Sequence, residues 1–287
     1  MKKKILVLGC NGMAGHLISL YLQEKSFEVT GFARQKSNIL HNTIIGDAGN
    51  LGLIQQIISS NNYDVVINCI GVLNQFADTN KEQAILLNSY LPHFLERITQ
   101  NTSTRIFQMS TDCVFAGNDG PYTEQSIPNG LSWYDKTKAL GELNNSKDLT
   151  FRNSIIGPDI KTNGIGLFNW LMQQHGTVKG FTGAIWTGVT TLTLARAMEK
   201  AINVEISGLI NLVNNTSISK FELLTLFNKY FKNNELNIIP DDKLKLDKSL
   251  RSERTDLPFI ISDYETQIKD MSEWVSKHHT LYPHYKI

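Results

Sequence analysis

The sequence predicts an α/β fold: a doubly wound parallel sheet with a small α/β cap formed by the C-terminal part of the chain. Short apolar runs rich in valine and isoleucine alternate with helical patterns through the first half. This alternation is typical of β-α-β units with right-handed crossovers. The run at 64–70 is apolar along almost its whole length, as expected of a parallel strand covered by helices on both faces.

The expected strands are short runs with β-branched residues, bounded by polar or glycine-containing segments. They lie at 4–8, 27–32, 44–45, 64–70, 105–110, 149–152 and 209–213. Apolar residues repeated at intervals of three and four predict helices between and after these strands. The expected helices are 13–24, 51–59, 81–99, 133–143, 165–175, 191–201, 221–231 and 263–278.

One segment interrupts this alternation. Residues 113–131 are rich in Gly, Asn, Asp and Pro, which predicts a long loop, and loops of that length inside a domain are usually functional. Beyond this loop the pattern becomes less regular. We expect residues 1–154 to form the sheet domain and 155–287 mainly the cap, with 191–214 returning to the sheet.

The composition argues against several classes of protein. The 287 residues carry a net charge of +1 and 41% of them are apolar, which fits a globular chain and argues against a nucleic-acid or membrane partner. Residues 1–10 imitate a secretory signal, but their apolar run 5–8 is shorter than the roughly 7–15 residues that a signal needs. We therefore expect a buried first strand and a cytoplasmic protein. The three cysteines lack metal-ligand spacing, so no metal site is expected; a homodimer stays open.

A glycine-rich segment, Gly9 to Gly15, reads G-C-N-G-M-A-G and stands between the first strand and the first helix. Glycines there permit a tight turn and let backbone N–H groups approach a pyrophosphate at the helix N-terminus. The spacing G-x-x-G-x-x-G in this position predicts a Rossmann dinucleotide site, the alternative being a plain glycine-rich turn. The expected contacts are Gly9, Asn11, Gly12, Met13 and Ala14.

The end of the second strand indicates which dinucleotide is bound. An acidic residue there suits the ribose of NAD, whereas arginine suits the 2′-phosphate of NADP. The sequence reads G-F-A-R-Q-K-S, without a carboxylate and with Arg34 available. Because a guanidinium can bind a phosphate through two hydrogen bonds, NADPH is favoured; the alternative is that Arg34 is a solvated loop charge.

Tyr134 and Lys138 stand four residues apart in a predicted helix, so their side chains share one face. A free tyrosine has a pKa of about 10, and a nearby ammonium favours the phenolate and lowers that pKa. The pair could therefore exchange a proton with a substrate oxygen. The alternative is one turn of an ordinary surface helix, and the preceding dinucleotide pattern favours the catalytic interpretation.

Five further motifs accompany the glycine segment. They are L-L-N-S-Y-L-P at 86–92, M-S-T-D-C-V-F-A-G at 109–117, P-Y-T-E at 121–124, Y-D-K-T-K-A-L-G-E at 134–142 and F-R-N-S-I-I-G at 151–157. Together these motifs resemble the extended short-chain dehydrogenase/reductases, and most closely the dTDP-4-dehydrorhamnose reductase family of nucleotide-sugar reductases. The resemblance covers most of the chain.

The resemblance implies roles for individual residues. Tyr134 would be the proton donor, Lys138 its partner that also holds the nicotinamide ribose, and Thr111 the hydroxyl on the substrate carbonyl. The further implied cofactor contacts are Asp47, Ala48, Cys69, Ile70, Gly71 and Ser110. The implied substrate contacts are Thr111, Asp112, Val114, Trp186 and Arg251. Trp186 could equally belong to the core, Arg251 and Arg254 to a solvated loop, and Asn88 is as much a structural candidate as a functional one.

The implied activity is NADPH-dependent reduction of the C4 keto group of a nucleotide-linked 4-keto-6-deoxy sugar, in surface polysaccharide precursor synthesis. Two departures from the family, N-C-I-G-V-L-N at 68–74 and Ile155 in place of a tryptophan, leave the sugar and base open, including a UDP-2-acetamido sugar. A dehydratase is disfavoured because Cys113 stands where those enzymes carry glutamate. The alternatives are an NAD-dependent epimerase and a non-catalytic NADP-binding regulatory subunit.

Overall fold

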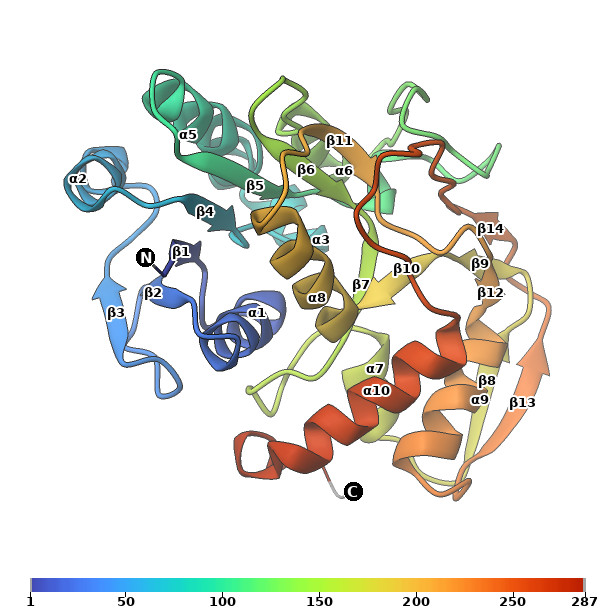
Figure 1. Ribbon diagram of the computed structural model, residues 1–287. Coiled ribbons are helices and arrows are strands. Elements are labelled where there is room, and N and C mark those ends of the chain that lie inside the picture. Colours follow the sequence, from blue (N-terminus) through green and yellow to red (C-terminus); the bar gives the residue numbers. More distant parts are fainter. Residues whose placement is uncertain (1, 286–287) are drawn as a thin grey trace.

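The computed structural model describes residues 2–285, and its centre is a parallel sheet (Figure 1). Within these residues seven strands pair in the order β11-β6-β5-β4-β1-β2-β3, all in parallel register. The strands are β1 (Lys4–Leu8), β2 (Glu28–Ala33), β3 (Asn42–Ile45), β4 (Val65–Asn68), β5 (Arg105–Met109), β6 (Leu149–Arg152) and β11 (Gly208–Asn211). The predicted doubly wound fold is therefore confirmed.

Helices cover both faces of this sheet because alternate residues of its strands are apolar. On β1, Ile5 and Val7 point into one core cluster, and Leu6 and Leu8 into the other. The first face is covered by α1 (Met13–Glu24) and α8 (Thr191–Ile202), and the second by α2 (Leu51–Asn61) and α5 (Leu91–Thr99). Both faces of the strands are thus dry, as parallel sheets require.

The helix expected at 81–99 is divided into three parts. It consists of α4 (Lys81–Ala84), a π-helical segment η1 (Ile85–Tyr90) and α5. Pro92 has no backbone N–H, so the carbonyl of Asn88 cannot receive the usual bond from four residues on. The short α3 (Asn74–Thr79), which the sequence did not predict, precedes this region.

A second group of helices and short strands lies in the C-terminal part of the chain, where the sequence predicts a cap (Figure 1). Its helices are α7 (Leu167–Met172), α9 (Lys220–Phe231), α10 (Tyr264–Lys277) and the 3₁₀ turn η3 (His279–Leu281). Its strand pairs are β7 (Ser154–Ile156) with β10 (Gly188–Thr190), β8 (Thr177–Phe181) with β13 (Asn237–Asp241), and β9 (Ala184–Trp186) with both β12 (Ile218–Ser219) and β14 (Leu246–Asp247). Of the cap elements, the sequence predicted the helices and missed these short strands.

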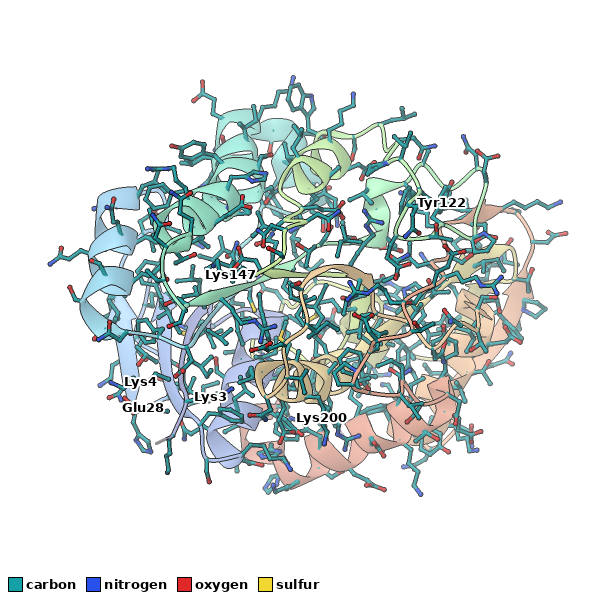
Figure 2. All side chains as sticks on the ribbon, turned by 45° about the horizontal axis from the view of Figure 1, so that its top comes forward. Lys3, Lys4, Glu28, Tyr122, Lys147 and Lys200 are labelled. Atoms are coloured by element: carbon teal, nitrogen blue, oxygen red, sulfur yellow. The ribbon has the colours of Figure 1, made fainter. Side chains whose placement is uncertain are left out.

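The predicted loop at 113–131 is irregular apart from the 3₁₀ turn η2 (Asp112–Val114) at its start. Tyr122, labelled in Figure 2, lies within this loop and contacts several of its other residues. Its ring stacks on Phe115 with centroids 4.1 Å apart, and its hydroxyl oxygen accepts from the N–H groups of residues 117–119. Buried backbone groups are thereby satisfied without regular secondary structure.

Candidate active site

The turn between β1 and α1 requires glycine at two positions. Gly9 has φ = +83°, and a Cβ added to Gly15 would lie 2.2 Å from the carbonyl oxygen of Gly9. Gly12 is the N-cap of α1, and the first turn of α1 has no acidic residue. The positive end of the helix dipole and its free N–H groups are therefore available to an anion.

A cavity of about 570 Å³ lies over this turn. The predicted cofactor residues that line it are Gly9, Asn11, Gly12, Arg34, Asp47, Ala48, Cys69, Ile70 and Gly71. A cavity of this size in front of a positive helix end fits the diphosphate of a dinucleotide, and the side-chain-free backbone of Gly12 leaves room for close approach. The residues present therefore fit a nicotinamide dinucleotide.

Several residues of this cavity were missing from the sequence-based prediction. They are Phe32, Ala33, Gln35, Gly46, Val72, Gln83, Leu87 and Lys161. Lys161 follows β7 and is far along the sequence from the other residues that line the cavity, so no local sequence pattern could indicate it. Arg34 and Lys161 are the cations among the lining residues, whereas the Asp47 carboxylate accepts from the N–H of Gly49 at 2.7 Å.

Tyr134 and Lys138 lie on α6 (Trp133–Leu140), which begins with a capping box formed by Ser132 and Asp135. Their side chains are buried, with exposed fractions of 9% and 5%, which excludes the surface-helix interpretation. The Lys138 ammonium donates to the carbonyl oxygen of Met109 at the end of β5. Thr111 follows β5, and its hydroxyl donates to Asp112 (3.0 Å) and accepts from the N–H of Cys113 (3.1 Å).

The electrostatics of this pair differ from the sequence-based expectation. Burial raises the pKa of Tyr134, the neighbouring Cys113 raises it further, and a side-chain contact with Thr111 lowers it. Burial also lowers the pKa of Lys138 to about 8, against the effects of Glu142 and Cys69. The expected lowering of the Tyr134 pKa is thus wrong for this structure, because desolvation of the phenolate dominates and Cys113, Asp112 and Asp135 raise the pKa as well. Tyr134 is held as a protonated phenol.

The structure places several predicted site residues away from the cavity. Val114 is fully buried among Phe115, Tyr122, Val213 and Leu250. Trp186 is 6% exposed and packs against Tyr264 in the core. Neither side chain lines the dinucleotide cavity, and the packing of Trp186 agrees with the core interpretation. Contact of Val114 or Trp186 with substrate stays a prediction.

Other predicted contacts are engaged elsewhere. The Ser110 hydroxyl donates to Glu142 at 2.6 Å rather than toward the cavity. Met13 and Ala14 form the first turn of α1 behind the glycines. Asp112 is buried, and burial raises the pKa of its carboxyl group. Arg251 remains exposed, so its expected substrate contact is untested.

Two residues that the sequence left open make contacts within the chain. Asn88 accepts from the N–H of Val72 (2.8 Å) and donates to the carbonyl of Val72 and to Thr137 (3.1 Å). It therefore ties the cavity wall to α6. The Arg254 guanidinium pairs with Asp256 through two hydrogen bonds, which leaves it poorly placed to clamp a diphosphate.

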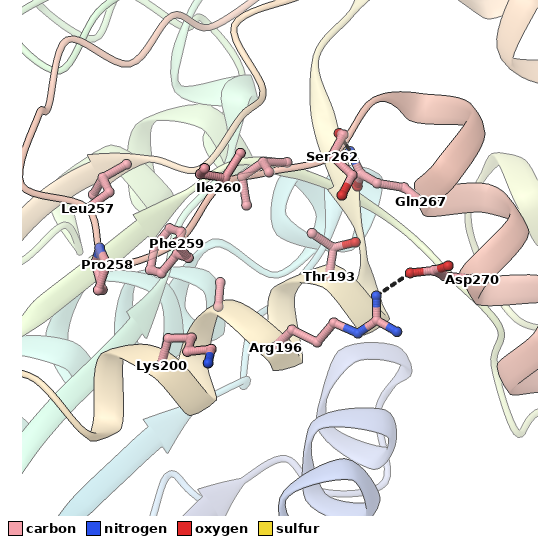
Figure 3. Close-up of a pocket in the computed structure, with 12 residues that line it drawn as sticks. Thr193, Arg196, Lys200, Leu257, Pro258, Phe259, Ile260, Ser262, Gln267 and Asp270 are labelled. Atoms are coloured by element: carbon pink, nitrogen blue, oxygen red, sulfur yellow. Dashed lines mark hydrogen bonds and ion pairs between the residues drawn. The ribbon is translucent and has the colours of Figure 1, made fainter.

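A second cavity, of about 660 Å³, lies between α8, the start of α10 and the extended segment 257–262 (Figure 3). Its walls include Leu257, Phe259 and Ile261, and the ion pair of Arg196 with Asp270 lies at its edge. It contains no predicted catalytic residue. In the part of the chain that the structure describes, no three His, Cys, Asp or Glu side chains gather into a metal site, and no helix has the length and apolarity to cross a bilayer.

Comparison with known proteins places these features in a family. Residues 2–252 match the RmlD substrate binding domain. Methionine adenosyltransferase 2 subunit beta of Xenopus laevis is 28% identical over 143 residues, which are 49% of this chain and 42% of that protein. A probable low-salt glycan biosynthesis reductase of Haloferax volcanii is 28% identical over 142 residues, 47% of this chain and 46% of that protein. The matched part spans less than half of either relative.

Solved structures support the same fold. The dTDP-4-dehydrorhamnose reductase of Bacillus anthracis, crystallised in complex with NADP, superposes with a TM-score of 0.77 at 19% identity, covering 94% of this chain and 98% of that one. The resemblance seen in the motifs is thus confirmed. Because the family match covers most of its length, the chain belongs to the RmlD substrate binding domain family, among the extended short-chain dehydrogenase/reductases similar to nucleotide-sugar reductases.

Proposed function

We propose that this protein reduces the C4 keto group of a nucleotide-linked 4-keto-6-deoxy sugar with NADPH, in the synthesis of surface polysaccharide precursors. The observation that carries the proposal is the grouping of Tyr134, Lys138 and Thr111. All three are buried at the carboxyl end of β5, the edge where open parallel sheets bind ligands. Lys138 and Cys69 are near enough to influence each other's pKa, and Cys69 lines the dinucleotide cavity.

The cofactor, when bound, supplies the hydride, and the chain supplies position and a proton. Thr111 and Tyr134 are two hydroxyl donors that a substrate ketone oxygen could accept from. The raised pKa of Tyr134 keeps its proton in place at neutral pH, and the alkoxide formed on reduction is basic enough to take it. The Lys138 ammonium stabilises the phenolate that remains.

The preference for NADPH rests on Arg34, which lines the cavity near the end of β2. We expect Arg34→Ala to weaken NADPH binding by about ten- to a hundred-fold, the scale of a lost charged hydrogen bond, and to leave NADH binding nearly unchanged. Titration of both cofactors by fluorescence measures the two affinities. Lys136→Ala removes an equal charge from the exposed side of α6 and serves as the control. Equal losses for NADPH and NADH would refute a 2′-phosphate contact.

The proposed reaction is tested with a panel of dTDP- and UDP-linked 4-keto-6-deoxy sugars, including 2-acetamido sugars. Loss of NADPH absorbance is expected with one member of the panel, and mass spectrometry should show a product heavier by two hydrogens. Interconversion of sugars without consumption of NADPH would instead identify an epimerase.

A regulatory, non-catalytic subunit is the second candidate. It is favoured by the similarity to methionine adenosyltransferase 2 subunit beta, a protein named as a subunit. On this alternative the chain would bind NADPH tightly and turn over no member of the panel. The buried Tyr134, Lys138 and Thr111 group favours the reductase, since a binding subunit has no need of a desolvated phenol and ammonium.

A further inference from the structure

An ion pair outside the catalytic trio lies directly behind it. Arg152, at the end of β6, donates to both carboxylate oxygens of Glu142, from Nε at 2.8 Å and from Nη2 at 2.6 Å. The two side chains are almost inaccessible, with exposed fractions of 2% and 8%. The Ser110 hydroxyl donates to the same carboxylate. The Glu142 carboxylate thus has a bidentate arginine partner and a third hydrogen-bond donor. A buried carboxylate can stay ionised when its charge is paired and its oxygens are hydrogen-bonded in this way.

We propose that Glu142 is a positioning residue of the reaction, whose buried carboxylate fixes the end of β5 and holds the Lys138 ammonium in its working place and charge. This inference rests on the proposed reductase function. It assigns to Glu142 no contact with substrate or cofactor. Its action passes through Lys138 and through the strand end that carries Thr111.

The first support is a closed ring of contacts. The Lys138 ammonium donates to the carbonyl of Met109, and the next residue, Ser110, donates its hydroxyl to Glu142. The N–H of Ser110 in turn donates to the carbonyl of Phe151 at 2.8 Å, and Phe151 precedes Arg152. Through its hydrogen bond with Ser110, Glu142 therefore fixes the short stretch of chain from Met109, whose carbonyl accepts from Lys138, to Thr111.

The second support is the spacing along the chain. Tyr134 and Lys138 stand one turn apart on the buried side of α6, and Glu142 follows four residues after Lys138, just past the end of this helix. The helix itself ends at Leu140 with Gly141 as its C-cap. Glu142 is thus placed at the negative end of α6, just beyond the ammonium that it supports.

The third support is electrostatic. The titratable groups that influence Lys138 are Glu142 beyond its own helix and Cys69 after β4, and both raise its pKa, whereas burial lowers it to about 8. The Met109 carbonyl faces it from β5, and Arg152 lies behind Glu142. A lysine loses its charge as pH rises through its pKa. Without the Glu142 carboxylate that pKa falls further, so the ammonium is lost at a lower pH.

A purely structural role for the ion pair makes a different prediction, and the Lys138 titration separates the two. The measurement is the pH titration of ¹³Cε signals in protein labelled at its lysines, with Lys138→Met identifying the relevant signal. In Glu142→Gln we expect the Lys138 titration to move to lower pH by about one unit or more, the scale on which one neighbouring charge acts. In Glu142→Asp, which keeps a carboxylate, the Lys138 titration should lie close to that of the wild-type protein.

Two further variants complete the design. Glu222→Gln removes a carboxylate from the capping box of α9, far along the chain from the ring, and should leave the titration in place. Should Glu142→Gln fail to fold, Glu142→Gln with Arg152→Gln replaces both charges by amides that can still hydrogen-bond. Because the Glu142 carboxylate raises the pKa of Lys138 and Arg152 lies on the other side of that carboxylate, the double variant should still show a shift to lower pH.

The titration needs neither substrate nor turnover, so it separates this inference from the proposed function. If no sugar is reduced but the Lys138 signal shifts, the proposed function fails and the coupling of Glu142 to Lys138 stands. In an active protein, the alkaline limb of the kcat profile should move to lower pH together with the titration. A folded Glu142→Gln protein with an unmoved Lys138 titration would overturn the inference.

Discussion

Replacing Tyr134 by phenylalanine is expected to reduce turnover by about 10²- to 10⁴-fold, the contribution of a positioned general acid. The substitution removes the one phenolic proton that α6 holds buried next to Thr111, and it leaves the ring that packs with Ala77 and Ala84. Cofactor affinity should therefore stay nearly constant. The measurement is steady-state kcat on the accepted sugar, together with NADPH binding for both proteins.

The matched control for this variant is Tyr90→Phe. Tyr90 lies at the end of η1 with about half of its surface exposed, and its ring packs only loosely on Phe94, with centroids 6.3 Å apart. It should retain wild-type turnover. If Tyr134→Phe kept most of its activity while folded, another group would have to supply the proton and the assignment of Tyr134 would be abandoned.

Gly15→Ala is the substitution with the largest expected effect on stability and on dinucleotide binding together. The added Cβ would meet the Gly9 carbonyl oxygen at 2.2 Å and the Gly9 carbonyl carbon at 2.9 Å. These are backbone atoms of the turn itself, so either α1 or the turn must move. We expect destabilisation by about 1–3 kcal/mol or more, as for overpacked cores, and loss of measurable NADPH binding.

Gly52→Ala supplies the comparison in another helix. Its Cβ would meet only the Asn50 side-chain oxygen, at an ordinary 3.6 Å, within α2. Removing a helical glycine should then stabilise the protein by about 0.5–1 kcal/mol. Thermal and urea unfolding of the two variants measure the difference. Similar behaviour of the two proteins would show that the close packing of Gly15 on Gly9 is unimportant.

The sheet was predictable because each of its strands has a recognisable pattern within a short window of sequence. Buried parallel strands such as β4 are buried at every position and apolar at all but the last, Asn68, and apolar residues in the helices between them repeat at intervals of three and four residues. The cap strands gave no such signal. β12 and β14 have two residues each, and β13 contains Pro240 and is partly exposed, so their pairing depends on tertiary contacts that no short window contains.

Cavity residues were predictable where they directly follow a predicted strand, as Gly9 follows β1 and Cys69 follows β4, and Lys138 was predictable from its spacing to Tyr134 on one helix. It was not predictable where function depends on distant chain segments. Lys161 reaches the cavity only because the chain beyond β7 folds back over the glycine turn. The sign of the Tyr134 pKa shift likewise depends on burial, which the spacing of Tyr134 and Lys138 does not specify.

The surroundings of predicted substrate and cofactor residues likewise depend on tertiary contacts that a motif does not contain. Val114 and Trp186 were expected to contact substrate, yet both side chains pack in apolar clusters. Ser110 stands in the motif M-S-T-D, and its hydroxyl is taken by Glu142. Glu142 itself was visible in the sequence only as the last letter of a motif; its pairing with Arg152 required the structure.

The central claim is that this chain transfers hydride to a sugar carbon and proton to its oxygen. The most direct measurement uses NADPH deuterated at the transferable C4 position of the nicotinamide, with the accepted 4-keto sugar, and locates the label by NMR. The account predicts one deuterium at C4 of the product sugar, equal in amount to the NADP⁺ formed. Product without deuterium at C4, or cofactor that stays reduced while the sugar changes, would contradict it.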